Sequence, residues 1–303
     1  MENTVAIVTD DPGWHGRELQ QAFAARGYDT RYLSLTECRL DLSAPGLVIL
    51  PGFEREWPVG VFVRGVPGGT LDQVILRLDV LHALKDLGLV VYNDARAVER
   101  TVDKAMTSFL LKRHGIPTPD TWVCESEPQA RAIVIREIGR GQRLVMKPLF
   151  GSQGVGVTLI ESPSAMPNPK DFRGVFYLQS FIDRPDGDWR DWRVFVIGGR
   201  AEAAMIRRNG YWITNRAQGG RCEPAELSGE LTHLAEAAVR AVDMDYAGVD
   251  LLQDGEGRWL VTEVNSIPAW KGLQSVCGFN VAERLVDHFL SLVAGSRVLE
   301  VVP

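Results

Sequence analysis

Residues 144–160, LVMKPLFGSQGVGVTLI, carry the clearest indication of how this chain folds. An apolar strand that includes Lys147 leads into a glycine-rich loop, Gly151-Ser152-Gln153-Gly154-Val155-Gly156, and a second apolar run follows directly. A dinucleotide-binding loop would be followed by a helix, and a Walker A loop would contain Gly-Lys-Ser/Thr, so both types of site are excluded. Two alternatives remain: a plain hairpin turn, or a flexible flap whose backbone N–H groups close over phosphates.

Two lysines are candidates for contacts with such phosphates. Lys147 lies inside an apolar strand, where an edge lysine whose ammonium snorkels to water is the simpler alternative. Its position beside a glycine flap favours a point charge on a nucleotide phosphate. Lys104, in the segment Val102-Asp103-Lys104-Ala105-Met106, is the second candidate, although its local sequence alone favours an exposed helical lysine.

An acidic strand near the C-terminus predicts a metal site. Glu263 and Asn265 share one face of the strand 259–264 and its extension, because strand side chains alternate with period two. Asp250 would lie opposite Glu263 if residues 247–252 paired with this strand in antiparallel fashion. Oxygen ligands without sulfur or imidazole suit Mg²⁺, and a bridging Glu could hold two ions. Incidental acids on a solvated hairpin face are the alternative.

Arginine is concentrated between these elements, at Arg190, Arg193, Arg207, Arg208, Arg216 and Arg221, with Tyr211 and Trp212 among them. Basic and aromatic residues together can bind nucleic acid, and they can also form a solvated loop. A third alternative is a site for carboxylates and phosphates, which arginine binds through two parallel hydrogen bonds. The formal net charge of −6 favours this third alternative over nucleic acid.

Working outward, the periodicity predicts an α/β unit followed by α+β units. Up to residue 95 we expect strands at 5–8, 30–33, 47–50, 59–63 and 89–92, and helices at 17–26 and 71–87; this alternation predicts a parallel sheet. Next we expect helices at 95–114 and 129–138, strands at 122–124, 144–148, 155–160 and 175–181, and a surface loop at 162–170. From residue 193 onward we expect a hairpin of 194–197 with 201–206, helices at 227–242 and 281–292, and strands at 247–252 and 259–264.

The composition is that of an ordinary globular protein, with 303 residues of which 45% are hydrophobic and 24% charged. The length suggests about two domains. No CxxC pair occurs, so a thiolate zinc site is not expected, and the five histidines show no metal or triad spacing and are expected to be structural. The N-terminus lacks a signal-peptide pattern and no apolar run approaches about 20 residues, so we expect a cytoplasmic protein without a membrane span.

Taken in order, these motifs resemble the layout of ATP-grasp ligases. They are Lys104, Lys147, the glycine loop, Gln179-Ser180-Phe181-Ile182, Asp191-Trp192-Arg193, Asn215 to Gly220, Asp250 and Glu263-Val264-Asn265. More narrowly, nearly the whole chain is similar to the RimK-type α-L-glutamate ligases. The resemblance implies an ATP-grasp fold (α/β plus α+β), with a parallel-sheet pre-ATP-grasp domain at 1–95. It also implies a central ATP-grasp subdomain at 96–182 and a C-terminal subdomain with the metal site at 183–303.

The resemblance also implies a role for each group of residues. ATP phosphates would be contacted by Lys104, Lys147, the flap residues Gly151, Ser152, Gln153 and Gly154, and Asn215. The adenine and ribose would be contacted by Gln179, Ser180, Phe181, Ile182 and Asp191. Two Mg²⁺ ions, for which Mn²⁺ can substitute, would be bound by Asp250, Glu263 and Asn265. A positive wall for the acceptor carboxylate and the acyl phosphate would consist of Arg207, Arg208 and Arg216.

Several positions depart from the family pattern. Ser180-Phe181 replaces a Glu-aromatic pair, Ile213-Thr214-Asn215 replaces Arg-Ser-Asn, Gln218 replaces an Arg, and Pro268-Ala269 replaces Pro-Gly. All but the first surround the acceptor. With Gly65-Val66-Pro67-Gly68-Gly69-Thr70, the arrangement is most similar to ligases that glutamylate a one-carbon carrier such as a tetrahydromethanopterin-type pterin.

The function expected from this resemblance is ATP-dependent amide formation through an acyl phosphate, with L-glutamate added to a carboxylate acceptor. One alternative is a lysine- or arginine-pathway ligase that modifies the C-terminal Glu of a carrier protein. Another is a regulatory module that binds ATP without turnover, against which the three metal ligands argue. We expect small-molecule partners, no nucleic acid and no membrane, and a homo-oligomer is compatible with the sequence.

Overall fold

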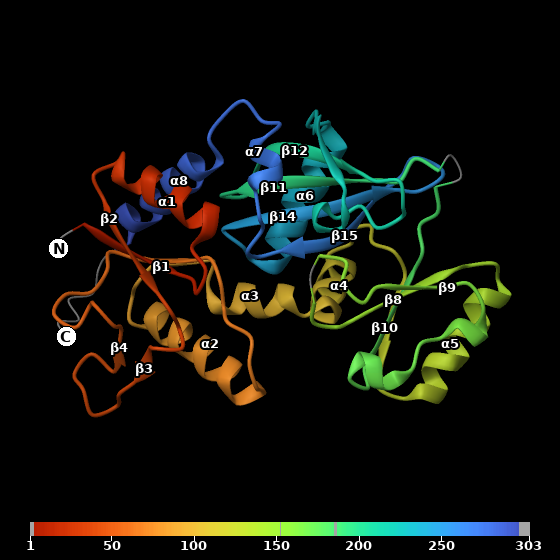
Figure 1. Cartoon of the computed structure of the whole chain (residues 1–303), viewed down its shortest axis with the longest axis horizontal. Coiled ribbons are helices and arrows are strands. Elements are labelled where there is room, and N and C mark those ends of the chain that lie inside the picture. Colours follow the sequence, from red (N-terminus) through yellow and green to blue (C-terminus); the bar gives the residue numbers. More distant parts are fainter. Residues whose placement is uncertain (1–2, 152, 185–186, 297–303) are drawn as a thin grey trace.

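The computed structural model describes residues 3–151, 153–184 and 187–296. Within these residues the strands form two four-stranded sheets, one five-stranded sheet and a two-stranded ribbon. The N-terminal sheet lies at one end of the long axis, the five-stranded sheet in the middle and the other four-stranded sheet at the far end (Figure 1). The predicted combination of a parallel α/β unit with antiparallel α+β units is confirmed.

The N-terminal sheet is parallel and buried. Its order is β2-β1-β5-β6, with β1 (Thr4–Val8), β2 (Asp29–Leu33), β5 (Val61–Val63) and β6 (Val91–Tyr92), connected in part by α1 (Gly13–Ala24) and α2 (Leu71–Asp86). All of β1 and β5 is buried, as in a sheet with helices on both faces. The strand predicted at 47–50 forms as β4 (Val48–Ile49), but it pairs antiparallel with β3 (Arg39–Leu40) outside this sheet.

The helix predicted over 95–114 is interrupted. α3 (Ala95–Val102) ends before Asp103, and α4 (Lys104–Arg113) begins directly after it. Asp103 has extended backbone angles (φ −85°, ψ 102°), and its carboxylate accepts hydrogen bonds from the N–H groups of Ala105 and Met106. An aspartate that caps the next helix in this way ends the previous one. The break makes Lys104 the first residue of a helix rather than an interior one.

The second four-stranded sheet is antiparallel, in the order β7-β10-β8-β9. Its strands are β7 (Thr121–Cys124), β8 (Leu144–Lys147), β9 (Thr158–Ile160) and β10 (Phe176–Ser180), and α5 (Glu127–Gly139) packs on it. The glycine-rich loop joins β8 to β9, so the predicted strand–loop–strand arrangement is confirmed. The predicted surface loop contains the short turns η1 (Pro163–Ala165) and η2 (Pro169–Phe172).

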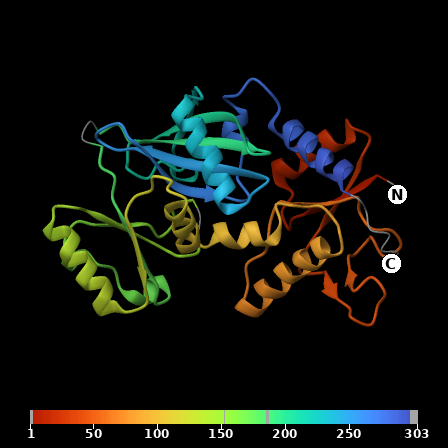
Figure 2. The ribbon, with the colours of Figure 1, turned by 180° about the vertical axis from the view of Figure 1, so that it is seen from behind.

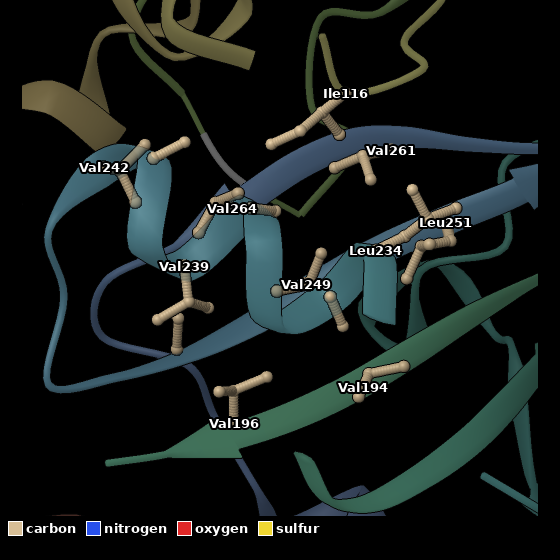
Figure 3. Close-up of a cluster of buried hydrophobic side chains, with 14 of the residues drawn as sticks. Ile116, Val194, Val196, Leu234, Val239, Val242, Val249, Leu251, Val261 and Val264 are labelled. Atoms are coloured by element: carbon tan, nitrogen blue, oxygen red, sulfur yellow. The ribbon is translucent and has the colours of Figure 1, made fainter. Parts of the chain in front are cut away.

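The five-stranded sheet is antiparallel throughout, in the order β13-β12-β11-β14-β15. Its strands are β11 (Arg190–Ile197), β12 (Arg200–Arg208), β13 (Arg221–Ala225), β14 (Tyr246–Gln253) and β15 (Trp259–Asn265). The edge strand β13, which contains a proline, was not predicted. α6 (Gly229–Val242) covers one face, and Figure 3 shows its Val239 and Val242 among Val194, Val196 and Val264 of the sheet.

The other face of this sheet shares a core with the N-terminal sheet. Phe289 of α8 (Val281–Gly295) lies 5.5 Å from Phe23 and 5.7 Å from Phe62 between ring centroids. Tyr246 of β14 stacks on Tyr92 of β6 at 4.9 Å. Figure 2 shows α8 beside α1. The boundaries at 95/96 and 182/183 stay predictions, and elements on either side of them pack together.

Among the described residues, the helices lack the length and apolar character that a membrane crossing requires.

Candidate active site

A cleft lies between the second four-stranded sheet and the five-stranded sheet. β8, the glycine-rich loop, β10 and the linker after it line one side, and β11, β12, β14 and β15 line the other. Most of the residues predicted to form the site line this cleft: Lys104, Lys147, Gly151, Gln153, Gly154, Gln179, Ser180, Phe181, Ile182, Asp191, Arg207, Asn215, Asp250 and Glu263. Ser152 lies outside the described residues. The fold therefore brings lysines and acids from distant segments to one place.

Lys147 is positioned by a chain of hydrogen bonds through the second sheet. Its Nζ donates to Oε1 of Gln179 (2.7 Å), and Nε2 of Gln179 donates to the hydroxyls of Thr121 (3.0 Å) and Tyr177 (3.1 Å). Tyr177 shares a further hydrogen bond with Ser108 of α4 (2.8 Å). Burial lowers the pKa of Lys147, and the nearby carboxylate of Glu263 opposes that shift. The ammonium is thus held at the cleft by a neutral amide oxygen, with the carboxylate of Glu263 nearby.

Lys104 approaches the same point from the start of α4. Its Nζ donates to the carbonyl oxygen of Gly151 in the glycine loop (2.6 Å) and lies 3.9 Å from Oε1 of Glu263. Burial lowers its pKa, and Glu263 and Asp103 oppose that shift. The lysine thus links the loop to the acidic strand β15, a position that the unbroken helix of the sequence prediction would not have indicated.

The glycine loop also touches the segment that contains Asn215. A Cβ at Gly154, where φ is +74°, would lie 2.8 Å from Ile213 and 2.9 Å from Oδ1 of Asn215. Nε2 of Gln218 donates to the carbonyl oxygen of Gln153 (3.3 Å). Glycine is therefore required at 154 both by its backbone conformation and by this close approach.

Aromatic side chains form one wall of the cleft. Phe181 packs against Trp189 (5.8 Å between centroids) and edge-on against Trp212 (5.6 Å), and all three line the cleft. From the sequence, Trp212 was expected only as part of the arginine-rich segment, and no motif pointed to Trp189. An apolar, aromatic wall suits a flat heterocycle such as adenine.

Asp250 lies deep in the cleft in a network of ion pairs. Arg193 donates from Nε to Oδ1 (2.6 Å) and from Nη2 to Oδ2 (2.7 Å), and Arg207 lies 2.9 Å from Oδ2. Arg207 also donates from Nε to Asp191 (2.8 Å). Burial by itself would raise the pKa of Asp250, but the two guanidinium groups lower it below its usual value. Arg193 appeared in the sequence motif without a role, and the structure gives it one.

Three predicted residues do not line this cleft. Arg208 pairs with Glu223 (3.1 Å) and with Asp188. Arg216 is exposed, and its Cδ would lie 3.4 Å from a Cβ at Gly272. Asn265 donates from Nδ2 to the carbonyl oxygen of Gly248 (3.1 Å).

The side chains predicted to bind Mg²⁺ offer carboxylate and amide oxygens only. β14 and β15 pair Asp250 with Glu263 and Gly248 with Asn265, as the sequence predicted for the first pair. Arginine N–H groups take up three of the roughly four lone-pair directions of Asp250. The carboxylate of Glu263 lies 3.9 Å from Nζ of Lys104, beyond hydrogen-bond distance. In the described part of the chain, no three His, Cys, Asp or Glu side chains form a metal-binding group. The third predicted ligand would be the amide oxygen of Asn265, which lies outside the lining of the cleft. Hard oxygen donors of this kind are those that Mg²⁺ prefers.

Residues 101–289, more than half of the chain, match the family described as RimK-like ATP-grasp domain. The chain belongs to this family. The resemblance inferred from the ordered motifs is confirmed, together with the ATP-grasp fold and the class of enzyme, an ATP-dependent carboxylate–amine ligase.

Curated relatives of the ligase include proteins named as alpha-L-glutamate ligases. Tetrahydromethanopterin:alpha-L-glutamate ligase of Methanococcus maripaludis is 35% identical over 236 residues, 76% of this chain and 78% of that protein. The protein of the same name from Methanosarcina acetivorans is 26% identical over 97% of this chain and 100% of its own. Probable alpha-L-glutamate ligase of Thioalkalivibrio sulfidiphilus is 31% identical over 93% and 94%, respectively.

Solved structures share the fold of the ligase. RimK domain protein ATP-grasp from Sphaerobacter thermophilus superimposes with a TM-score of 0.68 at 24% identity, covering 95% of this chain and 99% of that one. The ATP-grasp ligase PsnB, complexed with minimal precursor, Mg and ADP, superimposes with a TM-score of 0.72 at 20% identity, covering 96% and 98%. Both cover the N-terminal sheet as well as the two sheets that form the cleft.

Proposed function

We propose that the ligase joins the amino group of L-glutamate to a carboxylate of a small acceptor of the tetrahydromethanopterin type. Similarity over most of the chain to proteins named for that reaction supports the acceptor class and the amino acid. The structural observation that carries the proposal is that Lys104, Lys147 and Glu263 line the same cleft, with both lysines near the carboxylate of Glu263.

The proposed reaction activates a carboxylate, which is a poor electrophile. An acceptor carboxylate oxygen attacks the γ-phosphorus of ATP, the bond from that phosphorus to the bridging oxygen breaks, and ADP leaves. The neutral amine of glutamate then attacks the acyl carbon of the acyl phosphate. The C–N bond forms, phosphate leaves with the bonding electrons, and the nitrogen loses one proton.

Different side chains of the cleft are proposed to bind the phosphates, the adenine and the metal ions. Lys104 and Lys147 provide positive charge for the α- and β-phosphates, and the glycine loop closes over them to exclude water from the acyl phosphate. The aromatic wall around Phe181 receives the adenine. Two Mg²⁺ ions held by Asp250, Glu263 and Asn265, with Mn²⁺ able to substitute, would neutralise charge on the phosphates. Asp191 and Asn215 are proposed to contact the ribose and a phosphate.

The three arginines predicted to contact the acceptor differ in how far ion pairs already occupy their guanidinium groups. Arg207 is buried and shared between Asp191 and Asp250, and Arg208 is paired with Glu223. Arg216 has the freest side chain of the three, which makes it the best candidate to contact a substrate carboxylate.

The test is turnover with ATP, Mg²⁺, L-glutamate and a tetrahydromethanopterin-type pterin. We expect ADP release together with a product heavier by one glutamyl residue. Glu263→Ala should lower the rate by about a hundredfold or more, because phosphoryl transfer depends on metal charge stabilisation. Its circular dichroism should be unchanged, since Glu263 is partly exposed in the cleft.

Glu256→Ala, an exposed acid in the turn between β14 and β15, is the matched control and should retain full activity. Full activity of Glu263→Ala would contradict the metal assignment. ADP release with a peptide acceptor ending in Glu, and none with the pterin, would contradict the proposed acceptor class.

A further inference from the structure

Two loops at the carboxyl edge of the N-terminal sheet meet the five-stranded sheet away from the ATP cleft. The chain passes from β1 to β2 on one side, whereas β5 lies on the other side of β1. In open α/β sheets the crevice at such a reversal of strand order is the usual place for a ligand. His15, in the first turn of α1, and Arg64, directly after β5, lie at this reversal. Opposite them is the turn from β15 to α7 (Lys271–Gln274), which contains Trp270 (Figure 1).

Trp270 is fully buried at the centre of this group. Its backbone N–H donates to Nε2 of His15 (3.2 Å), and the two rings lie 4.6 Å apart. The guanidinium of Arg64 lies 4.6 Å from the centroid of the Trp270 ring, and Nζ of Lys271 lies 5.9 Å from that of Trp14. His15 and Arg64, from two other segments, thus contact Trp270, and Lys271 lies beside Trp14, the neighbour of His15.

Arg216 reaches the same group from η3 (Arg216–Gln218). Its Cδ would lie 3.4 Å from a Cβ at Gly272, the second residue of α7. Burial lowers the pKa of His15 to about 4, with further lowering by Arg64, Lys271 and Arg216. The imidazole is therefore neutral near pH 7, and the three cations face a neutral ring.

The cations of this group differ from the arginines of the ATP cleft. Arg193 and Arg207 are paired with carboxylates, whereas in the described parts of the chain no carboxylate forms an ion pair with Arg64, Arg216 or Lys271. In the same described parts, Nε of Arg64 and Nε1 of Trp270 are buried donors without a hydrogen-bond partner. Positive side chains close together, with buried N–H donors that lack a hydrogen-bond partner, are the features of a site that binds an anion.

This group lies directly against the strands that carry the acids of the cleft. Nη1 of Arg64 donates to the carbonyl oxygen of Pro268 (3.3 Å), in the turn that follows Asn265. A Cβ at Gly248 of β14 would lie 2.9 Å from Pro268 and 3.5 Å from Arg193. An anion held here would be close to the end of β15, the strand that carries Glu263 and Asn265.

We infer that Arg64, Arg216 and Lys271, arranged around Trp270 and His15, bind the carboxylates of a ligase substrate. Because no carboxylate of the described residues forms an ion pair with these three cations, we expect the ligand to carry at least two carboxylates. Both the incoming glutamate and a multiply acidic acceptor have this chemistry. This inference rests on the proposed function for the role of the ligand, and it assigns His15 a positioning role that its sequence did not indicate.

The kinetic test measures the KM for glutamate, the acceptor and ATP separately. In Arg64→Gln and Lys271→Gln the KM of one carboxylate substrate should rise about tenfold to a hundredfold, as expected when a charged hydrogen-bond partner is lost. The KM for ATP should change by less than about twofold. The substrate whose KM rises is the one bound at this site, and Arg64→Lys should restore part of the loss. Arg96→Gln, an exposed arginine on α3, is the control.

Unchanged KM values in both variants would overturn the inference. An equal rise in all three KM values, with a lower melting temperature, would show a structural role and would overturn it as well.

A second measurement is independent of turnover. Glutarate, used as a dicarboxylate probe, should raise the melting temperature of the wild-type protein and not that of Lys271→Gln. A shift of this kind without any ligase activity would support the site and contradict the proposed function. Ligase activity with no glutarate shift and unaltered KM values would support the function and overturn the site.

Discussion

At the scale of single residues, Asp250 shows how the fold sustains a buried charge. Its carboxylate is 3% exposed and is held by Arg193 and Arg207, the second of which also binds Asp191. Removing one partner from a buried ion pair typically costs about 3–5 kcal/mol, because a charge is then left without compensation. The predicted roles of Asp191 at the ribose and Arg207 at the acceptor therefore have to be compatible with these structural pairings.

Lys147 gives a prediction at the same scale. Lys147→Met keeps the apolar stem and removes the ammonium that faces Glu263 across the cleft. We expect ATP to bind about tenfold or more weakly, because a charge-assisted contact with phosphate is lost. Equilibrium binding of ATP by titration calorimetry measures this, with Lys112→Met, an exposed lysine of α4, as the control. An unchanged dissociation constant would remove Lys147 from the nucleotide site.

At the scale of elements, an aspartate at the start of β14 lies where burial and neighbouring acids disfavour its charged form. Asp245 directly precedes β14, and its pKa is raised to about 6 by burial, with Asp94 and Asp243 adding to the shift and Lys85 opposing it. A folded-state pKa above the usual 3.8 means that the folded protein binds the proton more tightly. The stabilising effect of that proton is complete below about pH 4 and is lost as the pH rises through about 6.

Asp245→Asn should therefore stabilise the protein at neutral pH. The gain is at most about 3 kcal/mol, from 1.36 kcal/mol per unit of pKa. It should shrink as the pH falls from 6 to 4. Urea unfolding at pH 7.5 and pH 4.5 measures this, with Asp254→Asn as a control whose acid has a lowered pKa and should change in the opposite sense. Equal effects of Asp245→Asn at both pH values would contradict the argument.

At the scale of the whole molecule, α8 holds the N-terminal sheet and the five-stranded sheet together. Phe289 of α8 is fully buried and contacts Phe23, Phe62 and Tyr92, all from the N-terminal unit. The inferred carboxylate site lies at the same junction, so its geometry depends on this packing. Helix α8 thus helps to position the loops that follow β1 and β5.

Phe289→Ala should destabilise the protein by about 3–5 kcal/mol, because a large buried ring is replaced by a cavity. Phe109→Ala removes the same side chain from an exposed site on α4, where phenylalanine is 58% exposed, and should change stability by less than about 0.5 kcal/mol. Urea unfolding compares the two variants. Similar losses in both would contradict the contribution of Phe289 to the buried core between α8 and the N-terminal sheet.

The sequence by itself determined most of the elements, the position of the glycine-rich loop between two strands and the pairing of Asp250 with Glu263. These depend on local periodicity, turn residues and strand alternation, which act within short stretches of chain. The site roles of Lys104, Lys147 and the acids, and the domain boundaries, remain predictions. Only the tertiary structure decided that Arg193 and Arg207 hold Asp250, that Arg64 lies over Trp270, and that Arg64, Arg216 and Lys271 all lie near His15. Those contacts join segments far apart in the chain, and they arise from how three sheets pack, which no local pattern encodes.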